Sequence, residues 1–291
     1  MAQKPLTLLA SEADTLLPFL LKHISGSRNN IKSILARGQV AVDAIPTTRF
    51  DYPIQQGQTI TVAAPGKVAV DFPFPILFED KDLIVIDKPA GLLTIASDKE
   101  KNITAYHMIT EVLRARTPAE RVFIIHRLDR DTSGVVMFAK NEETKQLFQE
   151  KWDEILIKRG YTAVLEGIPK EESGTVHSWL HETITHVVYS GSVYDGKEAI
   201  TNYRVLNQKG NYTLVDIELK TGRKNQIRVH MKDLDCPVAG DKKYGSKTDP
   251  LKRLALHASE LSFRHPKTKK EIVFKAPIPV AFFRNFSSKC K

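Results

Sequence analysis

The sequence has few cysteines and no long apolar run. Cys236 and Cys290 are the two cysteines among 291 residues, too few for a disulfide framework or a four-thiolate metal site, so we expect free thiols. No stretch reaches the roughly eighteen apolar residues that a membrane-spanning helix needs. The amino terminus also lacks the charged start, apolar run and cleavage site of a secretory signal. These absences predict a soluble, cytoplasmic protein with no membrane partner.

The sequence also lacks the common cofactor motifs. It contains no Walker A loop, no GxGxxG after a strand and no HExxH. His177 and His181 stand four residues apart, but no Glu occupies a general-base position between them and no third ligand is apparent. Surface or core histidines are therefore favoured over a metal site. We expect neither a metal nor another cofactor.

Basic residues are in excess, and the excess lies near the carboxyl terminus. Lys and Arg number 43 and Asp and Glu 34, a formal net charge of +9. Residues 1–64 carry a net charge of +2, residues 65–218 carry −5, and residues 219–291 carry +12. If the last segment folds against the middle of the chain, it can present phosphate-binding groups to a polyanion. The alternative is a solvated lysine-rich tail.

Proline and glycine near residues 64–75 interrupt the apolar pattern and mark a domain boundary. We therefore predict a small domain over residues 1–64, a linker over 65–75 and a larger domain over 76–291. In the small domain, a helix is expected from an N-cap at Ser27 to a stop at Gly38. Its polar face carries Arg28, Lys32 and Arg37. Strands are expected at 39–42 and 59–62.

In the larger domain, apolar runs predict several strands and one clear helix. The helix is expected over residues 142–159, ending at Gly160, with Lys158 and Arg159 at the negative end of its dipole. The strands are expected at 77–78, 83–87, 122–125, 135–139, 161–165, 199–206, 212–219 and 271–274. Because regular alternation of strands and helices is missing, this order predicts an α+β fold with a mixed, mainly antiparallel central sheet.

The most concentrated polar segment lies at residues 126–134, HRLDRDTSG, between two expected core strands. Asp129 has cations on both sides, which favour its ionised form, and a carboxylate must be ionised to attack carbon or to accept a proton. Asp129 is therefore our candidate nucleophile. A structural salt-bridged turn is the alternative from spacing alone.

This segment resembles the signature of the RluA-like family of RNA pseudouridine synthases, in which the Asp of HRLD is catalytic. Further segments resemble other family motifs in matching order and spacing over about residues 75–280: DKPAGL at 87–92, KRGYTA at 158–163, LKTGRKNQIRVH at 219–230, LALHA at 254–258 and APIP at 276–279. The resemblance implies a pseudouridine-synthase-like catalytic domain that isomerises uridine in structured RNA without a cofactor.

The same resemblance implies roles for individual residues. Asp129 would attack C1′ or remove the C2′ proton, a choice that the sequence leaves open. Arg228 would hold Asp129 through a bidentate ion pair. Tyr161 would stack on the uracil and relay a proton at C5, the alternative being a core tyrosine. The uridine must be extruded from folded RNA, and Arg127 would occupy the vacated space or contact a backbone phosphate.

One departure from the family pattern concerns RNA contacts. Lys224 and Asn225 stand before Gln226 where the family usually has Thr-His, so we expect altered RNA contacts with the chemistry retained. Residues 1–64 resemble, more loosely, an S4-type α/β RNA-binding module, the alternative being a small capping domain. The residues expected to bind RNA are Arg127, Arg130, Lys88, Arg223, Lys224, Asn225, Gln226, Arg28, Lys32 and Arg37.

Two other functions compete with RNA uridine isomerisation. A non-catalytic RNA-binding or ribosome-assembly factor would have no need of Asp129, Tyr161 and Arg228 together. A glycosidase using Asp129 and Asp131 is poorly supported, because the two carboxylates lie two residues apart in one loop. Ribosomal RNA is the first expected substrate and transfer RNA the second, since family members of this architecture use both. We expect a monomer with no obligatory protein partner.

Overall fold

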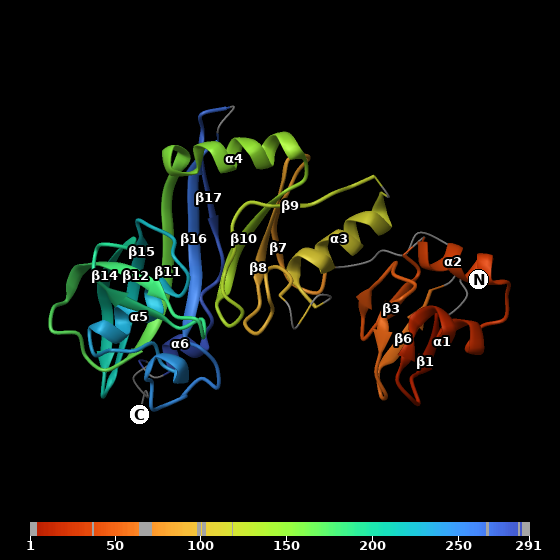
Figure 1. The fold of residues 1–291 in the computed structure, drawn as a ribbon, viewed down its shortest axis with the longest axis horizontal. Helices are drawn as coiled ribbons and strands as arrows, with labels where there is room; N and C mark the ends of the chain where they lie inside the picture. The colour runs from red at the N-terminus through yellow and green to blue at the C-terminus, as the bar shows by residue number, and fades with distance from the viewer. Residues whose placement is uncertain are drawn as a thin grey trace, which may run out of the picture. The chain divides into compact units, whose positions relative to one another are not determined.

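The computed structural model describes residues 5–36, 38–63, 72–97, 100, 103–117, 119–265, 268–284 and 286. The chain forms two compact units (Figure 1). The first consists of Met1–Pro75 and Ile95–Phe123, and the second of Ile76–Thr94 and Ile124–Lys291. The first unit thus includes Ile95–Phe123, a segment that the sequence assigned to the larger domain. Much of the predicted linker lies outside the described residues.

Within its described residues, the first unit contains three helices and two small sheets. The helices are α1 (Leu16–His23), α2 (Arg28–Ala36) and α3 (Ala105–Arg116). The four-stranded antiparallel sheet has the order β1 (Leu6–Leu9), β6 (Thr59–Val62), β3 (Val40–Val42) and β4 (Ile45–Pro46), and β2 (Asp14–Thr15) pairs with β5 (Pro53–Ile54).

The predicted basic helix of the first unit is α2. The Ser27 hydroxyl accepts a hydrogen bond from the Asn30 N–H at 3.2 Å, and Ile31 and Leu35 are buried in the core. The helix ends before Gly38, whose φ of +66° suits a left-handed C-terminal position. The side chains of Arg28 and Lys32 are exposed, whereas Arg37 lies outside the described residues.

Helix α3 belongs to the first unit, although in the sequence it lies between β8 and β10 of the second unit. Its Glu111 is 2% exposed, and its carboxylate accepts hydrogen bonds from the Thr48 backbone N–H and, at 2.8 Å, from the Thr48 hydroxyl. The Thr104 hydroxyl caps the helix by accepting from the His107 N–H. Side-chain contacts therefore tie α3 to the loop between β4 and β5.

The second unit is built on one large sheet. Its main order is β13 (Val188–Gly191), β12 (Ser173–Glu182), β14 (Lys197–Lys209), β15 (Tyr212–Leu219), β11 (Leu156–Glu166), β16 (Leu256–Arg264), β10 (Ser133–Ala139), β8 (Leu83–Lys88) and β7 (Ile76–Glu79), while β17 (Glu271–Lys275) pairs with β16 and β9 (Phe123–Ile124) with β10. Strands β10 and β16 run parallel, and the other neighbours in the main order run antiparallel. The predicted α+β fold with a mixed, mainly antiparallel sheet is confirmed.

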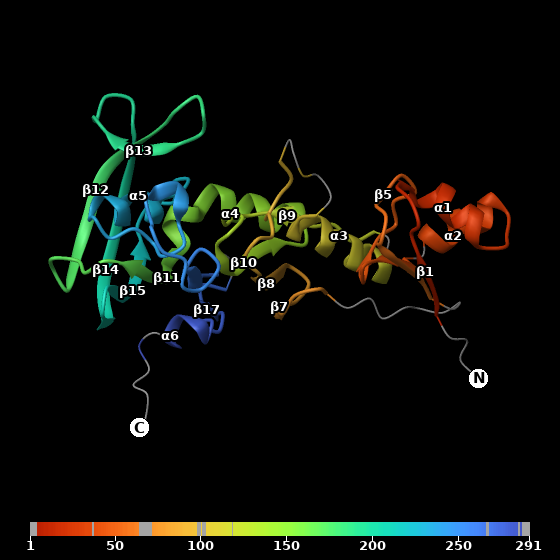
Figure 2. The ribbon, with the colours of Figure 1, turned by 90° about the horizontal axis from the view of Figure 1, so that it is seen from below.

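Helices cover parts of this sheet. Helix α4 (Glu142–Ile155) packs the buried Phe148 into an apolar cluster with residues of β8, β10 and β16. Helix α5 (Gln226–Asp233) lies against β13 and β14 (Figure 2). A short 3₁₀ helix (Lys242–Tyr244) and α6 (Ala281–Arg284) follow. No helix of the described segments is long and apolar enough to cross a membrane.

The predicted helix over residues 142–159 is too long. Helix α4 ends at Ile155, because the chain from Leu156 pairs with β16, where Arg159 lies opposite Leu261. Gly160 is a mid-strand residue opposite Glu218 and Glu260 rather than a helix stop. Lys158 and Arg159 consequently point to opposite faces of a strand instead of lying at a helix end.

Candidate active site

The loop that carries Asp129 is held by buried hydrogen bonds. The Thr94 hydroxyl donates to the Leu128 carbonyl at 2.9 Å and accepts from the Leu128 N–H at 3.2 Å. Lys88, at the end of β8, is fully buried, and its Nζ donates to the carbonyls of Pro89, Leu92 and Arg130 at 2.7–3.1 Å. These bonds connect the turn after β8 to the Asp129 loop.

The predicted RNA contact at Lys88 is therefore wrong. The side chain has no exposed surface, and its three N–H groups are used by three backbone carbonyls. Burial lowers the pKa of Lys88 to about 7, and the charges of Asp131 and Asp129 oppose that decrease. Lys88 supports the loop around Asp129 instead of contacting a ligand.

Gly134 allows the strand that follows this loop to approach β16 closely. Its φ is +114°, and a Cβ atom there would lie 2.1 Å from the Ala258 carbonyl oxygen. The hydroxyl of the adjacent Ser133 contacts the His257 Nδ1 at 2.8 Å and accepts a hydrogen bond from Arg253 Nη2 at 2.8 Å. Glycine is required at position 134 because any side chain would separate β10 from β16.

Arg228 lies near Asp129 but pairs chiefly with another carboxylate. Its Nη1 is 4.0 Å from Asp129 Oδ2. Its Nε and Nη2 donate to the two oxygens of Asp241 at 2.6 and 2.8 Å, and its Nη1 donates to Asn225 Oδ1 at 2.9 Å. The predicted bidentate pair between Arg228 and Asp129 is thus wrong. The bidentate partner is Asp241, which holds the guanidinium beside Asp129.

Electrostatics also differ from the expectation for Asp129. Burial raises the pKa of its carboxyl group, and the charges of Arg228 and Arg127 counteract only part of that increase. Burial therefore affects the pKa of Asp129 more than the flanking cations do, whereas the sequence suggested that the cations would dominate. For Arg228, burial lowers the pKa, but the hydrogen bonds and the charge of Asp241, with a smaller contribution from Asp129, together outweigh burial and raise it.

The turn before α5 is closed by its own side chains. Gln226 is 2% exposed; its Oε1 accepts from the Thr221 hydroxyl and the Arg223 N–H, and its Nε2 donates to the Ile200 carbonyl. Gln226 thus supports the turn, but it also lines a cavity together with Asp129, so its RNA contact stays a prediction. Asn225 is 8% exposed with a left-handed backbone (φ 54°), and its amide donates to the Tyr244 hydroxyl.

Other residues expected to bind RNA remain at the surface of their units. Arg127 and Arg130 are exposed, and Arg130 Nε donates to the Gly91 carbonyl at 3.1 Å. Lys224 forms an ion pair with Glu182. Arg223 is exposed, and its Nε donates to the Glu198 carbonyl at 2.9 Å. These positions are compatible with RNA binding, which stays a prediction for each of them.

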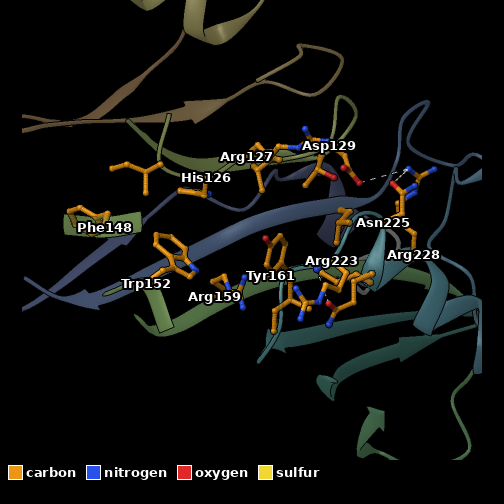
Figure 3. A pocket seen from close by; sticks show the side chains of 18 of the residues that line it. His126, Arg127, Asp129, Phe148, Trp152, Arg159, Tyr161, Arg223, Asn225 and Arg228 are labelled. Atoms are coloured by element: carbon orange, nitrogen blue, oxygen red, sulfur yellow. Dashed lines mark hydrogen bonds and ion pairs between the residues drawn. The ribbon is translucent and has the colours of Figure 1, made fainter. Parts of the chain in front are cut away.

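Asp129, Tyr161 and Arg228 line one cavity of about 560 Å³ in the second unit (Figure 3). Tyr161 lies on β11, opposite the loop of Arg127 and Asp129. Burial raises the pKa of the Tyr161 phenol to about 12, so the hydroxyl keeps its proton at neutral pH. The cavity thus combines a carboxylate, a fixed guanidinium and a protonated phenol.

Several residues that line the cavity, or that hold the residues lining it, were not assigned a role from the sequence. The motif segment contained His126, but its Nε2 accepts from the Met137 N–H, and burial lowers its pKa to about 4, so it is neutral. Trp152 follows the non-helical backbone at Lys151 in α4 and lines the cavity. Arg159 lines it from β11. No spacing rule could have identified Asp241, thirteen positions beyond its partner.

The described residues contain no group of three or more His, Cys, Asp or Glu side chains that could hold a metal ion. His177 Nε2 lies 3.0 Å from Glu198. His181 contacts the Ser192 carbonyl and Asp195. The two histidines of β12 thus have separate partners, His177 on β14 and His181 in the loop between β13 and β14.

Comparisons with known proteins agree with this site. Residues 82–233 match the sequence profile described as RNA pseudouridylate synthase. The RNA pseudouridine synthase YlyB of Bacillus subtilis is 34% identical over 269 residues, covering 87% of this chain and 86% of its own. Ribosomal large subunit pseudouridine synthase D of Nitrosomonas europaea is 33% identical over 269 residues, covering 87% and 77%.

A solved structure supports the same relationship. Human RNA Pseudouridylate Synthase Domain Containing 4 superposes with a TM-score of 0.61 at 25% identity, covering 72% of this chain and 92% of that one. The motif segments around Asp129 and Tyr161 fall within the matched profile. The chain therefore belongs to the RluA-like RNA pseudouridine synthases, enzymes that isomerise uridine to pseudouridine in RNA.

Proposed function

We propose that Asp129 carries out the covalent step of uridine isomerisation, with Arg228 and Tyr161 completing the catalytic set. The observation that supports this most is that all three side chains line one cavity, in which Arg228 Nη1 lies 4.0 Å from the Asp129 carboxylate. In the reaction the N1–C1′ bond breaks, the uracil turns, and a C5–C1′ bond forms. The C5 proton is lost and N1 gains a proton, so no other reactant is needed.

Asp129 would act either as a nucleophile at C1′ or as a base at the C2′ proton. Both steps need the ionised carboxylate. Because burial raises the pKa of Asp129, the carboxylate is more basic than a free one, which favours either role. Arg228, held by Asp241, stabilises the negative charge without forming a short bond that would tie up the attacking oxygen.

Tyr161 would form the surface on which the extruded uracil stacks. Its phenol keeps its proton at neutral pH, since burial raises its pKa to about 12. A protonated phenol can donate a hydrogen bond to the base. It can relay a proton only if it releases its own proton while it accepts a second one. Arg127, exposed on the cavity rim, would fill the space that the uridine leaves in the RNA.

We propose ribosomal RNA as the substrate and the first unit as an additional RNA-binding module of S4 type. The relative from Nitrosomonas europaea is named for the large ribosomal subunit, which supports the first part. The exposed Arg28 and Lys32 on α2 support the second, because two cations one helical turn apart can contact RNA phosphates.

The test is to map pseudouridines in total RNA from cells with and without the gene, and from cells that carry Asp129→Asn. The account predicts at least one ribosomal RNA uridine that is modified only when the unaltered protein is present. Asp131→Asn, the same change two residues along at an exposed position outside the cavity, is the matched control and should restore modification. Loss of pseudouridine from transfer RNA alone would refute the ribosomal substrate, and modification by Asp129→Asn would refute the role of Asp129.

A further inference from the structure

Arg159 places a positive charge in the cavity without a negative partner. Its Nη2 donates to the Lys220 carbonyl at 3.1 Å, and its Nε is buried with no hydrogen-bond partner. Within the part of the chain that the structure describes, no carboxylate forms an ion pair with it. Arg159 is half-buried, and a guanidinium that is partly removed from water without a counter-ion is costly, so proteins normally pair such charges.

Arg223 adds a second guanidinium to the same cavity wall. Its Nε donates to the Glu198 carbonyl at 2.9 Å, and it too has no ion-pair partner among the described residues. The two charges repel. Burial is the main cause that lowers the pKa of Arg159; Tyr161 and Asp153 oppose the decrease, and Arg223 adds a smaller decrease of its own. Backbone carbonyls therefore hold both guanidinium groups while their charge stays uncompensated.

Gly222 is the residue that lets Arg159 occupy this position. It lines the cavity between the two arginines, and a Cβ atom on it would lie 2.1 Å from Arg159 Nη1. A side chain at position 222 would push the guanidinium away from the wall. The close approach of backbone to guanidinium thus depends on glycine at this point.

The two arginines lie beside the expected place of the uracil. Arg159 and Tyr161 are two residues apart on β11 and both line the cavity, so their Cα atoms are about 6.6 Å apart along the strand. A ligand that stacks on Tyr161 can therefore bring an attached group to Arg159. Planar guanidinium groups with free donors bind phosphate oxygens strongly.

We propose that Arg159 and Arg223 form a phosphate-binding subsite that holds an RNA backbone phosphate attached to the uridine being isomerised. This inference rests on the proposed function, because it takes the base over Tyr161 to be uracil. The phosphate supplies the negative charge that Arg159 and Arg223 lack as a partner, and it fixes the nucleotide so that its ribose faces Asp129.

The test measures binding of uridine, uridine 5′-monophosphate and uridine 3′-monophosphate to the full chain carrying Asp129→Asn. One monophosphate should bind about tenfold more tightly than uridine, as a charge-assisted hydrogen bond of that strength gives. Adding Arg159→Gln should reduce this preference to about onefold while uridine affinity changes little. Gly222→Ala, which keeps every charge, should reduce the preference as well.

Lys158→Gln is the matched control. It removes the same charge one residue away, on the opposite face of β11, where Lys158 lies 3.5 Å from Glu260. The preference for the monophosphate should survive this change. If Lys158→Gln lowers it as much as Arg159→Gln does, or if Arg159→Gln leaves it intact, the subsite is wrong. Inorganic phosphate that binds as tightly as the monophosphate would show a free-phosphate site and would overturn the RNA assignment.

Failure of the subsite can be distinguished from failure of the proposed function. The unaltered chain is assayed in parallel for tritium release from RNA labelled at C5 of uridine. Tritium release together with a monophosphate preference that ignores Arg159 refutes the subsite alone. Absence of tritium release from every RNA tested refutes the proposed function, and the subsite with it.

Discussion

At the scale of single residues, the environment of Asp129 disfavours its charged form, which would suit its proposed catalytic role and lowers stability. Burial raises the pKa of its carboxyl group, which means that the folded protein disfavours the charged form. The nearest guanidinium, that of Arg228, is turned toward Asp241 and lies 4.0 Å away. A carboxylate with this little compensation is reactive, and it lowers the free energy of unfolding at neutral pH.

Replacing Asp129 by Asn should therefore stabilise the protein or leave its stability unchanged at pH 7.5. A raised folded-state pKa gives stability that is present below the unfolded-state pKa and is lost as pH rises through the folded value. The advantage of Asp129→Asn should thus be largest at pH 7.5 and shrink toward pH 4. Urea unfolding at several pH values measures it, and a variant less stable than the unaltered protein at pH 7.5 would contradict this reading.

Asp241→Asn should lower both stability and turnover. The side chains of Arg228 and Asp241 are 13% and 1% exposed, so removal of one charge leaves the other buried and unpaired, at a cost of about 3 kcal/mol. Arg228 would also lose the contacts that orient it beside Asp129. Urea unfolding and single-turnover rates measure the two effects. Asp249→Asn, at an exposed position in the same segment, is the control, and equal rates in the two variants would contradict a positioning role.

At the scale of elements, the sequence predicted where strands occur better than it predicted the ends of elements that depend on strand pairing. Strand 212–219 was predicted with both ends correct, because its apolar alternation is strong and turns flank it. Helix α4 was predicted four residues too long, since the helical spacing of Trp152 and Ile155 gives no sign that the chain from Leu156 pairs with β16. Local pattern cannot reveal such a partner distant in sequence.

For the candidate site, too, local motifs could be recognised in the sequence and contacts between distant segments could not. Asp129, Tyr161 and Arg228 could be predicted because each lies in a motif that resembles the family. Asp241 and Arg159 could not, because their roles arise from distances across the fold. Lys88 was misassigned, since a polar residue in a motif can as well be a buried hydrogen-bonding support as a contact to ligand.

The support that Lys88 gives to two loops is a property of the β8–β10 end of the sheet. Lys88→Met should leave three carbonyls without a donor and cost about 2–3 kcal/mol of stability. The Asp129 loop would lose its link to the turn after β8, so the single-turnover rate should fall while RNA affinity stays near its original value. Lys81→Met, whose side chain is 88% exposed, should change stability by less than about 0.5 kcal/mol. If RNA affinity falls as much as the rate does, Lys88 contacts RNA directly and its role as a support alone is wrong.

At the scale of the whole molecule, the basic carboxyl-terminal segment is part of the folded body over most of its described length. Strands β16 and β17 belong to the large sheet. Lys242, Lys243 and Lys252 line a second cavity of about 480 Å³ together with Gly91 and Asp131 of the middle segment. Of the two alternatives that the sequence left open, folding against the middle of the chain is the one observed. The charge surplus is thus available to the RNA backbone around the second unit.

The contribution of the first unit to RNA binding can be measured through salt dependence. The double variant Arg28→Gln, Lys32→Gln should weaken RNA binding and reduce the slope of log K against log salt by about 1.4–1.8. Deletion of residues 1–64 is a poorer test, because Glu111 of α3 would lose its Thr48 partners. Lys22→Gln, at a residue already paired with Asp14, is the control. An unchanged slope in the double variant would show that α2 does not contact RNA.

A single-turnover assay on the RNA identified by pseudouridine mapping tests whether Asp129 carries out the isomerisation. It compares the unaltered chain with Asp129→Asn and Asp131→Asn at protein concentrations that saturate the RNA. The account predicts that Asp129→Asn binds the RNA with unchanged affinity and produces no pseudouridine, while Asp131→Asn converts the uridine at close to the original rate. Conversion by Asp129→Asn at a rate near that of the unaltered protein would contradict it.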